Sequence, residues 1–272
     1  MKAALFTLII FILSLTISCE QKEKSSQNDR TEEKATKEQP KADWSSADRL
    51  KEEIELAIAN DELQLVKSLK WEKQSENINL HEEVEAYLNS QGDLVKVIEY
   101  FGNSEERKEG QRIFYFNQGT VALTTELIDV WQEDGGFVLT EREIAYENEV
   151  PTQGRQRSAN AIEELETQPW SKARAEEVPF TTAKQVLESE GPFKTHYLTF
   201  VQGEEALFLL FGEPKREDRF VTALRIDEMT PFIFELLENS DENRFKEVVI
   251  TFKVVGGLNQ PEFRVLETID WK

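Results

Sequence analysis

Residues 84–101, VEAYLNSQGDLVKVIEYF, carry the pattern that decides the fold. Small or aliphatic side chains alternate with Glu and Tyr over residues 83–88, which is the two-residue period of a half-buried strand. A turn sequence, Ser90-Gln91-Gly92, separates this run from a second apolar run at 94–101. The stretch therefore predicts a β-hairpin that is buried on one face and acidic on its solvent face.

The chain downstream repeats this arrangement. A run at 113–116 leads through a turn at 117–119 into a strand from Val121, and a third turn at 134–136 precedes an apolar run at 137–146. Strong turn residues between apolar runs are typical of hairpins. We therefore expect the first hairpin to continue into an antiparallel meander.

An aromatic residue and an asparagine recur beside these turns, at Tyr87, Tyr115 and Tyr146, so the spacings are 28 and 31 residues. A strand-pair unit repeated along the meander explains this recurrence. Hairpin chemistry recurring by chance explains it equally well, because Asn and Gly are the residues that tight turns require. Both explanations predict the same antiparallel arrangement.

One helix is expected ahead of the meander. Its apolar stripe, at i, i+4, i+7 and i+8, consists of Leu50, Ile54, Ala57 and Ile58. Ser45 or Ser46 is expected to cap the helix at its N-terminus, and the stripe ends near Asn60-Asp61.

Residues 169–272 are also expected to be mainly β. The five strand candidates are 195–201, 206–211, 220–226, 245–255 and 263–269. Thr230-Pro231, a capping residue followed by proline at the first helical position, opens a short helix through Leu237. Five short strands with one helix predict a small OB-like or SH3-like β-barrel. The whole chain is thus expected to be α+β and mainly antiparallel β.

The composition limits the class of protein. The 272 residues include 53 Asp and Glu against 32 Lys and Arg, which gives a formal net charge of −21. An aromatic content of 10% argues against wholesale disorder. Proteins that bind nucleic acid carry a basic footprint, and this acidic chain lacks one, so no nucleic-acid partner is expected.

Charge and turn residues together predict two domains. Residues 44–168 hold 27 acidic and 12 basic side chains, a net charge of −15, whereas residues 169–272 have a net charge of −6. The strongest breaks between the halves are 151–154, 167–170 and Pro179. We place the boundary near residue 168, between an acidic domain of one helix plus a meander and a small β-rich domain.

The N-terminus predicts where the protein resides. Residues 3–18 contain no charged side chain and stop at Cys19, the only cysteine, which a charged segment follows. Residues 1–18 are therefore expected to form a signal peptide, too short to span a membrane comfortably. Ile17, Ser18 and Cys19 resemble the bacterial lipoprotein class of signal peptides, although Thr16 occupies the position where that class usually has leucine. An ordinary secretory signal with an unrelated cysteine is the alternative.

The resemblance implies that Cys19 is lipidated and anchors the protein to a membrane of the cell envelope. We expect the outer membrane, with the body facing the periplasm or the cell surface. After Cys19, residues 20–43 contain seven acidic and six basic side chains and almost no apolar ones. Such a segment cannot bury enough surface to order itself, so residues 19–43 are expected to form a flexible charged tether.

Candidate chemistry in the body is weak. His81 is followed by Glu82 and Glu83 but lacks a second histidine four residues on, and His196 is expected to be a half-buried strand residue. Oxygen-rich segments at 239–243 and 133–135 are calcium-ligand candidates, with solvated turns as the default. The tryptophans are candidates for a ligand platform, although each is expected to pack at the end of an element. No catalytic residue, cofactor or metal ligand is assigned.

Three hypotheses for the function follow. The first is a non-enzymatic, lipid-anchored envelope protein that binds another protein or serves as an accessory module. The second is an acidic inhibitor or immunity-type lipoprotein that captures a basic enzyme such as a muramidase, with affinity that weakens steeply with salt. The third is a carboxylate-dependent hydrolase, although almost any pair of the 53 carboxylates can be proposed from sequence.

Overall fold

The computed structural model describes residues 44–272 except 76–77, 133–135, 205, 215–219 and 258–261. The predicted signal peptide, Cys19 and the predicted tether therefore lie outside the described residues. Among the described helices, none has both the length and the apolar character needed to cross a membrane.

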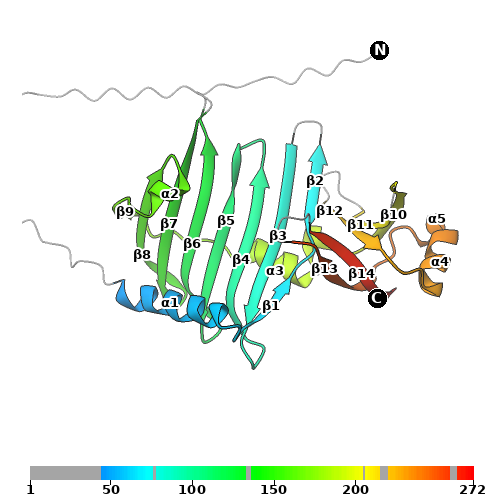
Figure 1. Cartoon of the computed structure of the whole chain (residues 1–272), viewed down its shortest axis with the longest axis horizontal. Helices are drawn as coiled ribbons and strands as arrows, with labels where there is room; N and C mark the ends of the chain where they lie inside the picture. Colours follow the sequence, from blue (N-terminus) through cyan, green and yellow to red (C-terminus); the bar gives the residue numbers. More distant parts are fainter. Residues whose placement is uncertain (1–43, 76–77, 133–135, 205, 215–219, 258–261) are drawn as a thin grey trace, which may run out of the picture. The chain divides into compact units, whose positions relative to one another are not determined.

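The described chain is mostly β and mainly antiparallel (Figure 1). The strands are β1 Gln64–Lys67, β2 Trp71–Ser75, β3 Ile78–Leu88, β4 Leu94–Asn103, β5 Lys108–Asn117, β6 Thr120–Trp131, β7 Phe137–Glu147, β8 Val150–Ala159, β9 Ser171–Ala173, β10 Tyr197–Gln202, β11 Leu207–Gly212, β12 Val221–Ile226, β13 Val248–Val255 and β14 Phe263–Trp271. The helices are α1 Ser45–Ala59, α2 Ile162–Leu165, α3 Thr181–Glu188, α4 Pro231–Glu238, α5 Ser240–Asn243 and the 3-10 helix η1 Gly191–Phe193.

The meander is confirmed. Strands β3 to β8 pair consecutively and antiparallel, and β3 and β4 form the hairpin expected from residues 84–101. Gly92 adopts a φ of 86° in its turn, and Gln118 and Gly119 both have positive φ between β5 and β6. Two successive residues with positive φ define the type I′ turn, whose twist matches that of the flanking strands. The turn residues therefore fix where each strand of the meander ends.

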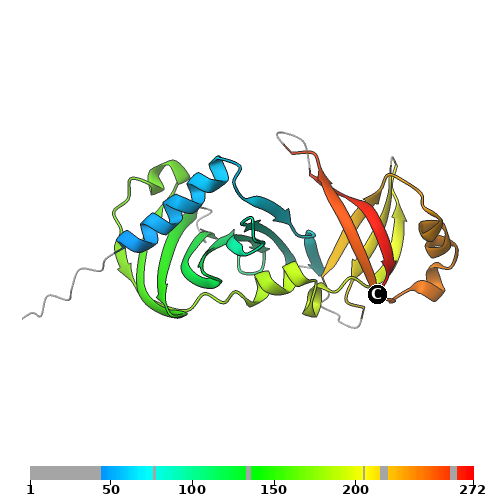
Figure 2. The same ribbon diagram turned by 90° about the horizontal axis from the view of Figure 1, so that it is seen from below.

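Helices cover the two faces of the meander (Figure 2). Tyr115 and Leu123 belong to a buried cluster with Ala47 and Ile54 of α1, whereas Phe114 belongs to the main core. Adjacent residues of a strand point to opposite faces. We call the side of Tyr115 the α1 face and the side of Phe114 the α3 face, because Phe180, at the start of α3, packs edge-on against the Phe114 ring at 5.1 Å.

The expected helix at the N-terminus is present, but its cap is not a serine. The N-cap residue of α1 is Trp44, which makes no side-chain capping hydrogen bond, so Ser45 and Ser46 lie inside the first turn. The backbone N–H of Asp48 donates to the Trp44 carbonyl at 2.9 Å. The Trp44 ring stacks on Arg155, so packing against the sheet, rather than local capping, sets the start of the helix.

Residues 151–154 were expected to form a break, and this is wrong: they lie within β8. Pro151 pairs with Tyr146 beside an irregularity in the register, where a missing N–H is tolerated. At Gly154, a Cβ atom would lie 2.8 Å from the carbonyl oxygen of Ala173 in β9. Glycine therefore permits the close approach of β9, which carries the sheet past residue 168.

The five strands expected in the second half are present as β10 to β14, but the expected small barrel is not shown. The strands belong to an open sheet in which β12 pairs with β11, β2 and β14. A single bridge, His196–Glu247, links the segment before β10 to the segment before β13. Because β12 also bridges to β2 through Val221 and Glu72, these strands continue into the meander. The domain boundary near residue 168 stays a prediction.

The helix expected from Thr230 is confirmed as α4, and its cap is the predicted one. The Thr230 hydroxyl accepts a hydrogen bond from the Ile233 N–H at 3.3 Å, with Pro231 at the first helical position. We expect Thr230→Ala to lower the free energy of unfolding by about 1 kcal/mol. Thr230→Ser should retain most of the stability in urea unfolding followed by circular dichroism; equal losses in both variants would contradict the capping role.

Candidate functional site

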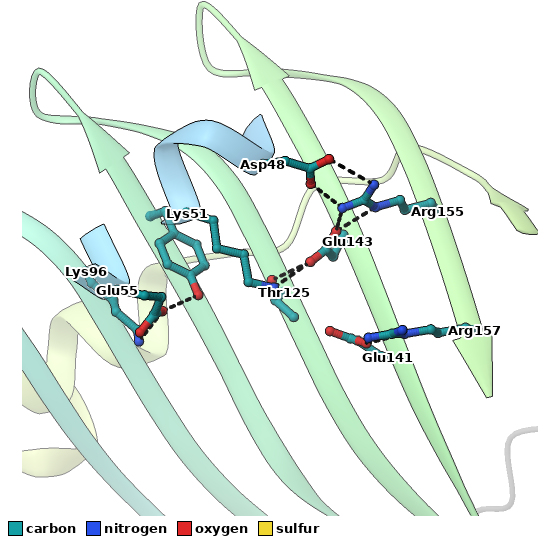
Figure 3. Close-up of polar contacts among 10 residues, drawn as sticks. Asp48, Lys51, Glu55, Lys96, Thr125, Glu141, Glu143, Arg155 and Arg157 are labelled. Carbon is teal, nitrogen blue, oxygen red and sulfur yellow. Dashed lines mark hydrogen bonds and ion pairs between the residues drawn. The ribbon is translucent and has the colours of Figure 1, made fainter. Parts of the chain in front are cut away.

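A buried carboxylate on the α1 face lies among side chains of α1 and the neighbouring strands (Figure 3). The side chain of Glu143 on β7 is 1% exposed, and it accepts hydrogen bonds from Lys51 Nζ at 2.8 Å and from Arg155 Nε at 2.6 Å. Lys51 comes from α1 and Arg155 from β8. Glu143 therefore holds the helix and two neighbouring strands together.

Arg155 has partners on every side. Its guanidinium group also pairs with Asp48 of α1 and stacks between two tryptophan rings, 4.3 Å from the centre of Trp44 and 4.5 Å from that of Trp170. Burial alone would lower the pKa of Arg155, but hydrogen bonds and charges of Asp48 and Glu143 raise it. The Arg155 guanidinium group is thus permanently charged and is held by Asp48 and Glu143.

A second polar contact secures the other end of α1. Glu55 accepts a hydrogen bond from Lys96 Nζ at 2.6 Å and another from the Tyr115 hydroxyl at 2.8 Å. Burial, and then the Glu55 charge, raise the pKa of Tyr115. These contacts and the Glu143 cluster hold α1 against the sheet through ion pairs and hydrogen bonds. We therefore assign this polar network a structural role.

The α3 face carries a row of alternating charges across four adjacent strands. Glu99, Arg112, Glu126 and Arg142 lie directly opposite one another in the register of β4 to β7. Arg112 lies 3.2 Å from both Glu99 and Glu126, and Arg142 lies 3.7 Å from Glu126. Arg112 is thereby shared between two carboxylates, and Glu126 between two arginines.

Glu82 joins one end of this row without an ion pair to any other described residue. Burial, and then the charge of Glu99, raise the pKa of Glu82 to about 8. Burial also raises the pKa of Glu99, against the opposing effect of Arg112. One oxygen of each carboxyl group, Oε2 of Glu82 and Oε1 of Glu99, is buried without a hydrogen-bond partner in the described structure. Glu82 is therefore protonated near neutral pH.

An apolar pocket of about 600 Å³ lies on the α3 face, at the end of the meander where its turns gather. Its walls come from β1, the three hairpins and α3, which lies behind β3 and β4 in Figure 1. The apolar lining is Val66, Ala86, Leu88, Leu94, Phe116, Val121, Tyr146, Val178, Phe180 and Leu187. We call this site the apolar pocket.

The far wall of the apolar pocket is fixed by specific contacts. The Tyr146 hydroxyl accepts a hydrogen bond from the Val178 N–H at 2.9 Å, which holds the segment before α3 against the sheet. The Phe180 ring packs edge-on against Phe114 and Phe116 at 5.1 and 5.3 Å. The pocket is therefore a preformed feature of the fold, of the size that small-molecule sites have.

The two histidines occupy separate environments. His81 lies against Gly102 and lines a second pocket of about 580 Å³ together with Tyr100 and Asp129. His196 is half-buried, as expected, with Nδ1 3.9 Å from Glu213. The described residues contain no cluster of three or more His, Cys, Asp or Glu side chains able to hold a metal ion.

The two calcium-ligand candidates have different outcomes. Residues 240–243 form helix α5, and the Ser240 hydroxyl is hydrogen-bonded to Tyr197 at 2.7 Å. This segment is therefore a short helix instead of a solvated turn. The second candidate, 133–135, lies outside the described residues.

The described tryptophans serve mainly as packing groups. Trp71 is fully buried and meets Phe193 edge-on at 5.7 Å. Trp44 and Trp170 enclose Arg155, as described above. Trp131 remains 52% exposed beside Phe137. None of the five tryptophan rings lines the apolar pocket.

The pocket residues were missed in the sequence because α3 was not expected. A signal existed: Ala183, Val186 and Leu187 are spaced i, i+3, i+4, and Ala183 and Val186 are buried. Comparison with protein-family models, curated proteins and solved structures finds no match to this chain.

Proposed function

We propose that the protein is a lipid-anchored, non-enzymatic binding module of the cell envelope that holds a small amphipathic ligand in the apolar pocket. The lipoprotein-like N-terminus supports the localisation, with Cys19 as the anchor to the outer membrane. The observation that carries the binding function is the preformed pocket of about 600 Å³, which lies within the range of about 300–1,000 Å³ typical of ligand sites.

The lining chemistry supports an apolar ligand body. Ten side chains of the pocket wall are aliphatic or aromatic, and the charged groups lie at the mouth. Transfer of apolar surface from water into such a pocket contributes about 25 cal/mol per Å². A ligand that buries its hydrocarbon part and keeps a polar head in water therefore matches the pocket.

The other two hypotheses have less support. Glu99, Glu141 and Glu143 pair with arginine or lysine inside the body, which leaves fewer carboxylates for a basic enzyme. For a hydrolase, the described carboxylates with raised pKa values are Glu82, Glu99 and Asp129. Glu82 and Glu99 line neither of the pockets described above, and Asp129 lines only the second pocket, apart from the other two. Both hypotheses stay predictions.

The experiment is a fluorescence titration of residues 20–272, the predicted mature chain without its lipidated Cys19, with the uncharged probe phenylnaphthylamine. We expect saturable binding that Val121→Trp weakens by about tenfold or more. Val121 lines the pocket next to Phe116, its register partner on β5, and an indole ring there would fill part of the pocket volume. Val249→Trp, at a 52% exposed position on β13, is the matched control and should leave binding unchanged.

Two results would reject the proposal. One is the absence of saturable binding to the wild-type chain. The other is equal affinity in Val121→Trp and Val249→Trp, with both folded by circular dichroism. If Val121→Trp fails to fold, Leu187→Trp tests the same space from the α3 wall and should give the same loss of affinity.

A further inference from the structure

The mouth of the apolar pocket is acidic. Four charged side chains line it: Glu149 in the turn between β7 and β8, Glu177 ahead of Val178, and Lys184 and Glu188 on α3. All four are exposed. Lys184 Nζ lies 3.9 Å from Glu188 Oε1, so the charge of this lysine is largely balanced within its own helix. Two carboxylates from separate segments, Glu149 and Glu177, then dominate the field at the entrance.

The interior of the apolar pocket is also suited to a positively charged ligand. Aromatic rings of Phe116, Tyr146 and Phe180 line the pocket, and two of them are held in place by the contacts described above. The faces of aromatic rings attract quaternary and primary ammonium groups and offer nothing comparable to an anion. The rim charge therefore favours a cation at the mouth, and the aromatic rings accept a cationic head group that enters the pocket.

We propose that the apolar pocket selects amphipathic ligands with an ammonium head group over those with a carboxylate or phosphate head group. The ligand's hydrocarbon part occupies the space among the aliphatic side chains, and its cationic head remains at the mouth near Glu149 and Glu177. This inference rests on the proposed function, since it concerns the same pocket. It adds the chemical class of the ligand.

The physical basis is electrostatic. Charges near an apolar wall act through a lower effective dielectric constant than charges in bulk water, so carboxylates at the rim attract a cation and repel an anion. Salt screens this effect, with a screening length of about 10 Å at 0.1 M and about 3 Å at 1 M. Discrimination by head group should therefore be largest at low ionic strength.

The test uses three ligands that share a decyl chain: decyltrimethylammonium, decanol and decanoate. Each displaces phenylnaphthylamine from the predicted mature chain, below its micelle concentration and at low salt. We expect decyltrimethylammonium to bind about tenfold more tightly than decanoate, with decanol between them. The ratio should fall towards one at high salt, while decanol binding changes little.

Variants assign the selectivity to the rim. The double variant Glu149→Gln, Glu177→Gln keeps the Lys184–Glu188 pair and should bring the affinity ratio close to one. The control, Glu163→Gln, Glu164→Gln, removes the same charge from exposed positions on α2 that do not line the apolar pocket, and should keep the ratio. Lys184→Gln should increase the preference for the cation.

The outcomes separate this inference from the proposed function. Equal or tighter binding of decanoate at low salt, or an unchanged ratio in the rim variant, overturns the head-group inference while leaving the binding function intact. Failure of the uncharged probe and of decanol to bind overturns the proposed function itself.

Discussion

Replacement of Glu143 by glutamine is expected to lower the free energy of unfolding by about 3 kcal/mol. The carboxylate is buried and balances both Lys51 and Arg155, and a neutral amide of the same size leaves these cations without their shared counter-ion. Removal of one partner from a buried ion pair typically costs about 3–5 kcal/mol. We expect the lower end, because Arg155 keeps its contact with Asp48.

The measurement is urea unfolding followed by tryptophan fluorescence, since Trp44 and Trp170 stack on Arg155 and report on this cluster. Glu147→Gln, at an exposed position at the end of the same strand, is the matched control and should change stability by less than about 0.5 kcal/mol. If Glu143→Gln and Glu147→Gln unfold at the same urea concentration, the Glu143 cluster does not hold α1 to the sheet.

Replacement of Glu82 by glutamine is expected to stabilise the protein at alkaline pH and to have little effect in acid. The unfolded chain gives up this proton near the ordinary value of 4.5, whereas burial and Glu99 hold the pKa in the folded state at about 8. Between these values the native state binds more protons than the unfolded state, so stability falls as pH rises. The contribution is fully present below about pH 4.5 and lost above about pH 8.

Glutamine has no proton to lose, so Glu82→Gln removes this loss of stability. We expect the variant to exceed the wild type by about 4 kcal/mol near pH 8 and to match it near pH 4. Urea unfolding across this range measures the slope, with Glu105→Gln, at an exposed position in the turn after β4, as control. Parallel stability profiles for wild type and Glu82→Gln would show that Glu82 is ionised in the folded protein.

The hairpins of the meander were predictable because each depends on local information. Alternating side chains define the strands, and residues such as Gly92 and Gly119 supply the positive φ that the turns require. β8 was missed for the opposite reason. Pro151 and Gly154 have the local character of a break, but a register irregularity and the close approach of β9 make both suitable for a strand.

The apolar pocket could not be derived from the sequence. Its lining comes from β1, three successive hairpins and α3, so residues as distant as Val66 and Leu187 share one space. Their spacing along the chain carries no signal of this contact. The ion pairs of Glu143 could not be predicted for the same reason, since Lys51 and Glu143 are separated by 92 residues. Net charge indicated many carboxylates but not which ones the fold would bury.

The row of alternating charges on the α3 face also bears on how the strands find their alignment. A shift of two residues would keep every side chain on its own face but would place Glu99 opposite Gly110 or Phe114 instead of Arg112. A buried carboxylate without a cation is costly, so slipped hairpins are penalised one by one as they form. Each added strand is thus held in the correct register by its own ion pair to the strand before it. Apolar alternation alone does not distinguish registers that differ by two residues.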